Sequence, residues 1–280
     1  MEDPAIGTRY SGPAGAGGRV PPAHRGCRLP TGRRPALQPR PLRCRGLRAL
    51  ASVGIAIASA SAPCIAAAQF AASASLKSDE RVRGRSISRG QPTATLEASY
   101  DHRSGAYVGG AATAVLAGRE GSGLLGTQVY AGYAVRTSNG FDIDLGIAGH
   151  AYTRRYSDGR APRFTELHAG VSRGMFSLQA RYAPNDQGRD APAAYLGLGT
   201  SKALAPDWSL NARTGVLIQT SGAPALGGRR LRYDTSLALR RRIAAYELEA
   251  RWTLGGPDDA YFDAPWQGAS ALVLSVRRGL

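Results

Sequence analysis

Cysteine and long apolar runs are both scarce in this 280-residue chain, and each scarcity excludes a class of protein. The three cysteines, Cys27, Cys44 and Cys64, all lie near the start, so a disulfide-stapled fold over the remainder is excluded. No uninterrupted run reaches the roughly 18 apolar residues that a transmembrane helix needs. With a mean hydropathy of -0.24, a membrane protein built from several helices is also excluded.

The first 68 residues differ in composition from the rest. Residues 1–41 are rich in Pro, Gly, Ala and Arg without apolar periodicity, which predicts a disordered or untranslated leader. Residues 42–68 predict a signal peptide, because a basic stretch at 40–48 precedes an apolar run at 49–62 and three alanines before Gln69. A buried helix is the alternative for the apolar run. We expect cleavage near Ala68 and export to the bacterial outer membrane.

Much of the positive charge leaves with this leader. Of 36 Lys and Arg and 20 Asp and Glu, residues 1–68 hold 10 and 2, which leaves 26 against 18 and no cysteine in the expected mature chain. The sequence shows no helix-turn-helix, zinc-ligand spacing or aromatic–basic signature. We therefore expect no nucleic-acid partner.

The remaining chain alternates apolar and polar residues. In "AYELEARWTL", residues 245–254, every second residue is apolar and the others are mostly charged, as in a strand with two unlike faces. The same alternation recurs along the chain, and no window shows a helical period. It predicts twelve strands, at 73–87, 92–102, 106–116, 126–136, 140–152, 163–173, 175–183, 193–202, 208–218, 230–241, 244–254 and 270–278.

Connection lengths favour an outer-membrane barrel over a soluble sandwich. If the N-terminus is periplasmic, connections such as "TRRYSDGRAPR" and "TSGAPALGGRR" are external, and "RSG", "TSNG" and "SRG" are periplasmic turns. Long loops outside and tight turns inside are typical of outer-membrane barrels, and "RGQP" is the one short external connection expected. We therefore predict an all-β fold over 69–280, a transmembrane up-and-down antiparallel β-barrel of about 12 strands.

One face of many strands carries charge, and we expect this face to line a hydrated lumen. A packed core could not accept so many unpaired charges, whereas a wet lumen can. A solvated outer face of a sandwich is the alternative. The expected lumen-facing residues are Glu97, Asp101, Asp142, Asp144, Glu166, Arg181, Arg213, Arg232, Asp234, Glu247, Glu249 and Arg251.

Residues 75–110, "SLKSDERVRGRSISRGQPTATLEASYDHRSGAYVGG", carry a set of spaced Arg, Ser, Gly and Pro residues. This stretch resembles the N-terminal signature of the Gcw-chp family of predicted proteobacterial outer-membrane proteins of unknown function. Matching positions are Arg83, Gly84, Ser86, Ser88, Gly90, Pro92, Gly105, Tyr107, Thr165 and Glu166. The resemblance extends over roughly 70–280 and implies an outer-membrane barrel, with no substrate or catalytic residues.

The expected mature chain has three histidines that could act as catalytic bases: His102, His150 and His168. His150 shares a strand face with Asp142 and Asp144, but any polar face aligns residues in this way. No nucleophile elbow, paired metal spacing or phosphate loop is present. We expect no catalytic residues, no metal and no cofactor.

The sequence therefore predicts a monomeric outer-membrane barrel that is a narrow, porin-like channel or a structural barrel. Its expected partners are outer-membrane lipid and the barrel-assembly machinery. A lipid hydrolase of the outer membrane and a soluble periplasmic β-protein are the alternatives. Aromatic residues near strand ends are expected at the membrane interfaces: Tyr100, Tyr182, Trp208, Tyr246 and Trp252.

Overall fold

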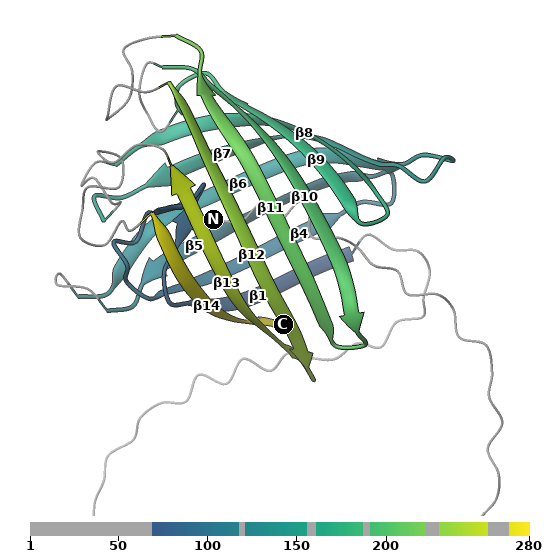
Figure 1. Ribbon diagram of the computed structural model, residues 1–280. Helices are drawn as coiled ribbons and strands as arrows, with labels where there is room; N and C mark the ends of the chain where they lie inside the picture. Colours follow the sequence, from purple (N-terminus) through teal and green to yellow (C-terminus); the bar gives the residue numbers. More distant parts are fainter. Residues whose placement is uncertain (1–68, 118–120, 156–160, 187–190, 222–229, 257–268) are drawn as a thin grey trace, which may run out of the picture. The chain divides into compact units, whose positions relative to one another are not determined.

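The computed structural model describes residues 69–117, 121–155, 161–186, 191–221, 230–256 and 269–280 (Figure 1). The expected leader at 1–41 and signal peptide at 42–68 lie outside the described residues. Within the described part, no helix is long and apolar enough to cross a membrane.

Twelve long strands of the described residues form one closed antiparallel barrel, which confirms the predicted fold class. Each strand pairs with its neighbour in the sequence, and the first strand pairs with the last to close the ring. The barrel strands are β1 (Gln69–Lys77), β4 (Thr93–Asp101), β5 (Ala106–Val115), β6 (Gly123–Arg136), β7 (Asp142–Tyr152), β8 (Arg163–Arg173), β9 (Phe176–Ala183), β10 (Ala193–Ala205), β11 (Trp208–Gln219), β12 (Leu231–Ile243), β13 (Tyr246–Gly256) and β14 (Ser270–Gly279).

The first predicted strand was wrong in its bounds. The alternation was extended over 73–87, but β1 ends at Lys77, and residues 78–92 leave the wall of the barrel. These residues contain a two-stranded hairpin, β2 (Arg81–Val82) with β3 (Arg85–Ser86), which we call, with its flanks, the inserted segment. "RGQP" is therefore the end of a long connection.

The two ends of the barrel differ. At one end the connections are short: 102–105, 137–141, 174–175, 206–207 and 244–245, and both ends of the barrel chain lie there too. We call this the turn end. The opposite end, the loop end, carries the long connections, including the inserted segment. This parity matches outer-membrane barrels.

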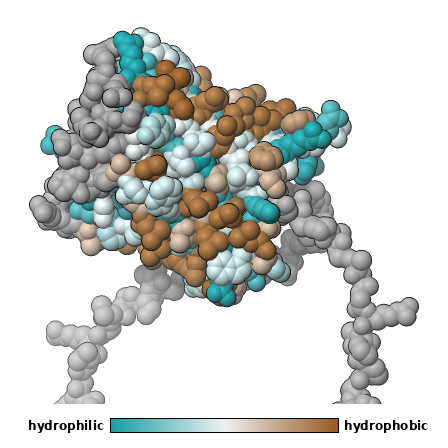
Figure 2. Space-filling view, viewed as in Figure 1, coloured by the Kyte–Doolittle hydropathy of each residue, from teal (hydrophilic) through white to brown (hydrophobic). Residues whose placement is uncertain are grey.

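The two faces of the wall also differ. Outward positions carry large apolar side chains that are exposed, such as Leu96 at 62%, Leu198 at 57% and Leu145 at 56%. Figure 2 shows apolar side chains spread over the outer face of the strands turned to the viewer. Inward positions hold the buried polar residues, including Gln128, Glu166 and Gln179. An apolar outside and a polar inside is the reverse of a soluble barrel.

Candidate functional site

The inserted segment is a tight hairpin whose tip is Arg83–Gly84. Both residues have positive φ, 50° and 76°, as a two-residue turn of the type I′ kind requires. Gly84 suits this conformation and also allows close approach, because a Cβ there would lie 3.0 Å from the Cα of Gly255 on β13. Arg83 has a Cβ, so its positive φ is strained, and its side-chain contacts must compensate.

Hydrogen bonds within the segment fix its shape. The hydroxyls of Ser86 and Ser88 donate to Asp79 Oδ1 at 2.6 and 2.9 Å, and the Gly90 N–H donates to Ser86 Oγ at 2.9 Å. Arg81 bridges Asp79 Oδ2 and the Gly84 carbonyl. Ser86, Ser88, Gly84 and Gly90 belong to the signature noted in the sequence. The signature therefore encodes the fold of this hairpin.

Apolar contacts hold the segment against the wall at the loop end. Ile87 is 1% exposed and packs in a cluster with Val115, Leu125 and Tyr152, from β5, β6 and β7. On the seam side, the Ser78 N–H donates to the Leu274 carbonyl of β14 at 2.9 Å. The segment connects β1 and β4, and it is thus attached to the strands on both sides of this pair, to β14 on one side and to β5, β6 and β7 on the other.

The side chain of Arg83 connects the inserted segment to the opposite wall of the barrel. In the ring order, β8 to β10 lie opposite β1 and β4, and Arg83 reaches both β8 and β10. Its guanidinium forms an ion pair with Glu166 of β8, lies 3.7 Å from Asp186 Oδ1, and stacks 4.7 Å above the ring centroid of Tyr195 on β10. The side chains of Arg83 and Glu166 are only 14% and 5% exposed. A hairpin from one wall therefore docks on the opposite wall.

The charge of Arg83 is stabilised by this docking. Burial by itself lowers the pKa of the guanidinium, but the carboxylates of Glu166 and Asp186 raise it, and the net pKa lies above its ordinary value. The ion pair with Glu166 consequently persists at any pH at which the carboxylate is ionised.

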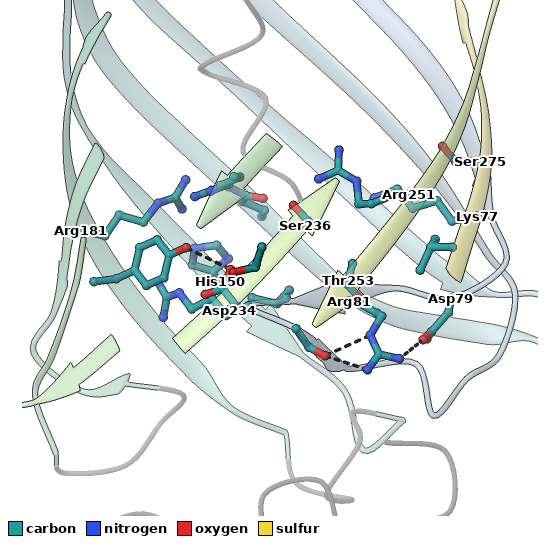
Figure 3. A pocket seen from close by; sticks show the side chains of 18 of the residues that line it. Lys77, Asp79, Arg81, His150, Arg181, Asp234, Ser236, Arg251, Thr253 and Ser275 are labelled. Carbon is teal, nitrogen blue, oxygen red and sulfur yellow. Dashed lines mark hydrogen bonds and ion pairs between the residues drawn. The ribbon is translucent and has the colours of Figure 1, made fainter. Parts of the chain in front are cut away.

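Beneath the segment lies an interior cavity of about 110 Å³ (Figure 3). Its walls come from the inserted segment, β1 and the strands from β6 to β14. Cationic and acidic side chains both line it. Arg213 donates to Gln179 Oε1 at 2.6 Å, and Tyr195 donates to Asp234 Oδ1 at 3.2 Å. The cavity is small, polar and crossed by side-chain bridges.

The twelve residues expected in the lumen fall into three groups. Six line the cavity under the inserted segment: Glu166, Arg181, Arg213, Asp234, Glu249 and Arg251. Two line a second cavity at the turn end: Glu97 and Glu247. The remaining four are the buried Arg232, Asp144 beside Tyr107, Asp142 in an exposed ion pair with Arg136, and Asp101 at the end of β4.

Opposite charges among these residues pair within the barrel. Arg181 lies 3.4 Å from Glu166, and Arg251 lies 2.8 Å from Glu249, which also pairs with Arg240. At the turn end, Arg277 lies 3.0 Å from Glu97. The Arg181–Glu166 and Arg240–Glu249 bridges join neighbouring strands, the Arg251–Glu249 bridge lies within β13, and the Arg277–Glu97 bridge runs from β14 to β4 across β1. Together they narrow the lumen. Whether the twelve residues line a conduction path stays a prediction.

His150 and His168 pair across strands, whereas His102, in the turn after β4, has its Nδ1 2.9 Å from the Ser104 hydroxyl. His168 Nε2 lies 3.0 Å from the Tyr107 hydroxyl and 3.4 Å from Asp144 Oδ2, and His150 Nε2 lies 3.5 Å from Glu166 Oε2. Among the described residues, no hydrogen bond joins the ring of His150 or His168 to a serine, threonine or cysteine side chain. The described residues also hold no group of three or more His, Cys, Asp or Glu placed for a metal.

Inward tyrosines lie flat over glycines of the neighbouring strand. Tyr107 of β5 is opposite Gly132 of β6, and Tyr130 is opposite Gly109 of β5, so the two pairs are reciprocal. A Cβ at Gly132 would lie 2.3 Å from the Tyr107 hydroxyl and 2.5 Å from the Leu145 carbonyl. The glycines make room for the rings, and the Tyr107 hydroxyl donates to Asp144 Oδ1 at 2.7 Å.

We expect Gly132→Ala to destabilise the barrel by about 1–3 kcal/mol, because an added methyl forces Tyr107 and the backbone of β7 to move. Urea unfolding followed by tryptophan fluorescence measures this change. Gly149→Ala is the matched control, since a Cβ there meets only Val129 at 3.5 Å. Equal effects of the two substitutions would show that the tyrosine–glycine pair does not constrain the wall.

The sequence pattern does not predict several residues of this site. The alternation predicts Arg83 on a barrel strand, and it does not assign the inward tyrosines Tyr107, Tyr130 and Tyr195 to a face. A signal for Tyr107 was present, since it alternates with Gly109 and the two small residues Ala111 and Thr113 on one face of β5. No local signal shows that Arg83 contacts Glu166, because that contact depends on the closure of the ring.

Comparison with known proteins identifies the family. The family described as "Bacterial protein of unknown function (Gcw_chp)" matches residues 60–226, more than half of the chain. The chain belongs to the Gcw_chp family. The match confirms the resemblance, although it ends at 226 and not at 280. It includes the whole inserted segment and Glu166, on which Arg83 docks.

Solved barrels are similar to this chain at low identity. A KdgM porin in complex with disordered oligogalacturonate is 10% identical, with a TM-score of 0.46 over 75% of this chain and 98% of that chain. A NanC porin is 10% identical, with a TM-score of 0.47 over the same shares. The β domain of the Bordetella autotransporter BrkA is 18% identical, with a TM-score of 0.38 over 75% and 98%. No curated protein matches the chain.

Proposed function

We propose that the protein spans the bacterial outer membrane as a barrel whose lumen is closed or narrowed by its own inserted segment. The apolar outer face supports the membrane location, because large patches of exposed apolar side chains are rare on soluble monomers. Outward aromatics gather at the turn end, at the height of an interfacial girdle: Phe70, Tyr100, Tyr133, Phe176, Trp208 and Tyr246.

The docking of Arg83 on Glu166 is the observation that carries the narrow-pore proposal. A twelve-stranded barrel is wider than the eight-stranded kind that side chains can fill, so an open lumen of this size would conduct. Here a hairpin crosses the lumen, and bridged charges fill much of the remaining space. The protein is therefore a structural barrel or a channel with a small aperture.

A hydrated interior accompanies this narrowing. The Gln128 Oε1 and Asn211 Nδ2 atoms are buried, and no described protein atom makes a hydrogen bond to them. Leaving such a group without any partner costs about 1–3 kcal/mol. Lumen water supplies partners, and the buried groups are then satisfied. Water between the side chains fits a slow pathway for small ions better than a dry, packed core does.

Planar-bilayer recording tests the proposal. We expect unit currents far below those of a general diffusion porin, or none, from the purified protein. Large, steady and unselective currents would contradict a closed lumen. The lipid-hydrolase alternative instead predicts fatty-acid release from the same bilayers.

Export by the signal peptide, cleavage near Ala68, assembly by the barrel machinery and a monomeric state all stay predictions. The chemistry of a permeating solute, if one passes, stays open in this proposal. The mixed charges of the cavity favour small polar solutes over apolar ones, because its lining presents both hydrogen-bond donors and hydrogen-bond acceptors.

A further inference from the structure

The outward face of the barrel carries charge of one sign only. All Asp and Glu residues on the described barrel strands occupy inward positions, whereas five Arg and Lys residues point outward. One of these, Arg163, begins β8 at the loop end. The other four lie at the turn end, on four alternate strands of the ring: Arg173, Lys202, Arg241 and Arg278, on β8, β10, β12 and β14.

Aromatic side chains alternate with these cations around the same arc. Arg241 pairs in register with Trp208, and its guanidinium lies 5.1 Å from the centroid of the indole ring. Arg278 pairs in the same way with Tyr246, at 5.5 Å. Arg173 lies 4.8 Å from the ring centroid of Phe141, which precedes β7. We call the four cations with Phe141, Trp208 and Tyr246 the rim belt.

The rim belt has almost no acidic neighbours on the outside. The three turns that join its strands are 174–175, 206–207 and 244–245, and Asp207 is their one acidic residue. The described chain pairs none of the four cations with a carboxylate within ion-pair distance. Exposed cations beside membrane-interface aromatics are placed to meet anions in the adjoining lipid layer.

We propose that the rim belt binds the headgroups of anionic phospholipids in the leaflet at the turn end. The aromatic rings fix the depth of this rim at the interface, and the guanidinium and ammonium groups then lie level with lipid phosphates. Arginine suits this role, because its planar fork donates two hydrogen bonds to one phosphate. The arc of the ring from β8 to β14 gathers anionic lipid, and the arc formed by β1, β4, β5 and β6 does not.

This inference rests on the proposed membrane location, but it can fail independently. The chain holds three tryptophans, Trp208, Trp252 and Trp266. In a Trp252→Phe, Trp266→Phe background, Trp208 alone reports from the belt. The protein is reconstituted in phosphatidylcholine vesicles that contain the same mole fraction of brominated phosphatidylglycerol or of brominated phosphatidylcholine with matched acyl chains. Quenching of Trp208 then measures which lipid lies beside it.

We expect brominated phosphatidylglycerol to quench more strongly, with a relative binding constant about fivefold higher for each cation that meets a headgroup. Gln at all four belt positions (R173Q, K202Q, R241Q, R278Q) should make the two lipids equivalent, and 0.5 M salt should weaken the preference. Arg163→Gln, at the opposite end, is the matched control and should leave the preference unchanged.

The outcomes separate the two proposals. Equal quenching by both lipids in the parent protein would overturn the rim belt while leaving the membrane location intact. Absence of quenching by either lipid would instead show that Trp208 is not in contact with acyl chains, and would contradict the membrane location. A preference that survives the fourfold substitution would also overturn the inference. The resistance of the barrel to unfolding in unheated gel samples shows that each variant has folded.

Discussion

Replacing Arg83 by alanine should open the lumen. Arg83 supplies the contact between the inserted segment and Glu166 on the opposite wall, and both side chains are buried. Removing one partner of a buried ion pair costs about 3–5 kcal/mol. Glu166 keeps Arg181 at 3.4 Å, so the lower value applies. About 3 kcal/mol corresponds to roughly a hundredfold larger fraction of undocked segment. Bilayer recordings should then show frequent openings and a larger mean current.

Two further variants make this result specific. Arg89 lies in the same segment, but its guanidinium donates to the Arg154 carbonyl at the rim. Arg89→Ala should therefore leave the current near that of the parent protein. Glu166→Gln should act in the same direction as Arg83→Ala, and the double variant should add little to either one, because both remove a single interaction. Unchanged current in Arg83→Ala would show that other contacts hold the segment or that the lumen is blocked elsewhere.

A second large effect is expected at the centre of the outer face. Leu237 is outward on β12, 44% exposed, and four residues from both Tyr233 and Arg241, which lie towards the two rims. It is therefore near the middle of the apolar band. An arginine at the bilayer midplane of a barrel costs about 2–4 kcal/mol. Leu237→Arg should lower the free energy of unfolding by this amount, measured by guanidinium titration in lipid vesicles.

The control for this prediction is Leu248→Arg on the same face. Leu248 pairs with Arg241 in the register of β12 and β13, so it lies near the turn-end rim, where the cost of a cation falls to about 0–1 kcal/mol. Equal costs at the two positions would mean that the outer face does not meet a lipid layer of graded depth. In detergent-free buffer without lipid, a soluble β-protein would instead tolerate both arginines.

The alternation of apolar and polar residues predicts the strands well because the two faces of the barrel wall meet two different environments. In "YELEARWTL" one face of the strand is apolar and the other is charged, so a register shift of one residue would place Glu247 and Glu249 in the apolar band. The register and the facing of this strand therefore follow from its sequence. Eleven of the twelve predicted strands overlap closely with the observed ones for this reason. The end of a strand is marked less clearly, and β10 runs three residues beyond its predicted end at 202.

The inserted segment shows where this reasoning stops. Residues 81–84 alternate well enough to pass as a continuation of β1, since the uncharged Val82 and Gly84 interleave with the charged Arg81 and Arg83. The decision to leave the wall rests on the positive φ of Arg83 and Gly84 and on contacts with β8, β10 and β13. Those contacts join residues distant in sequence, and alternation carries no information about them. The alternation along each strand predicts which charged residues face the lumen. It does not predict which residues form ion pairs with them.

The position of the inserted segment also bears on how the protein reaches its folded state. The segment follows the first barrel strand in the sequence, yet its Ser78 N–H is hydrogen-bonded to Leu274 on the last strand, and its Arg83 docks on Glu166 in the middle of the chain. Loop closure over such sequence separations is slow, so its docking belongs to a late event. We therefore expect the hairpin to dock together with closure of the seam between β1 and β14. Unfolding in the reverse order would begin with release of the hairpin at that seam.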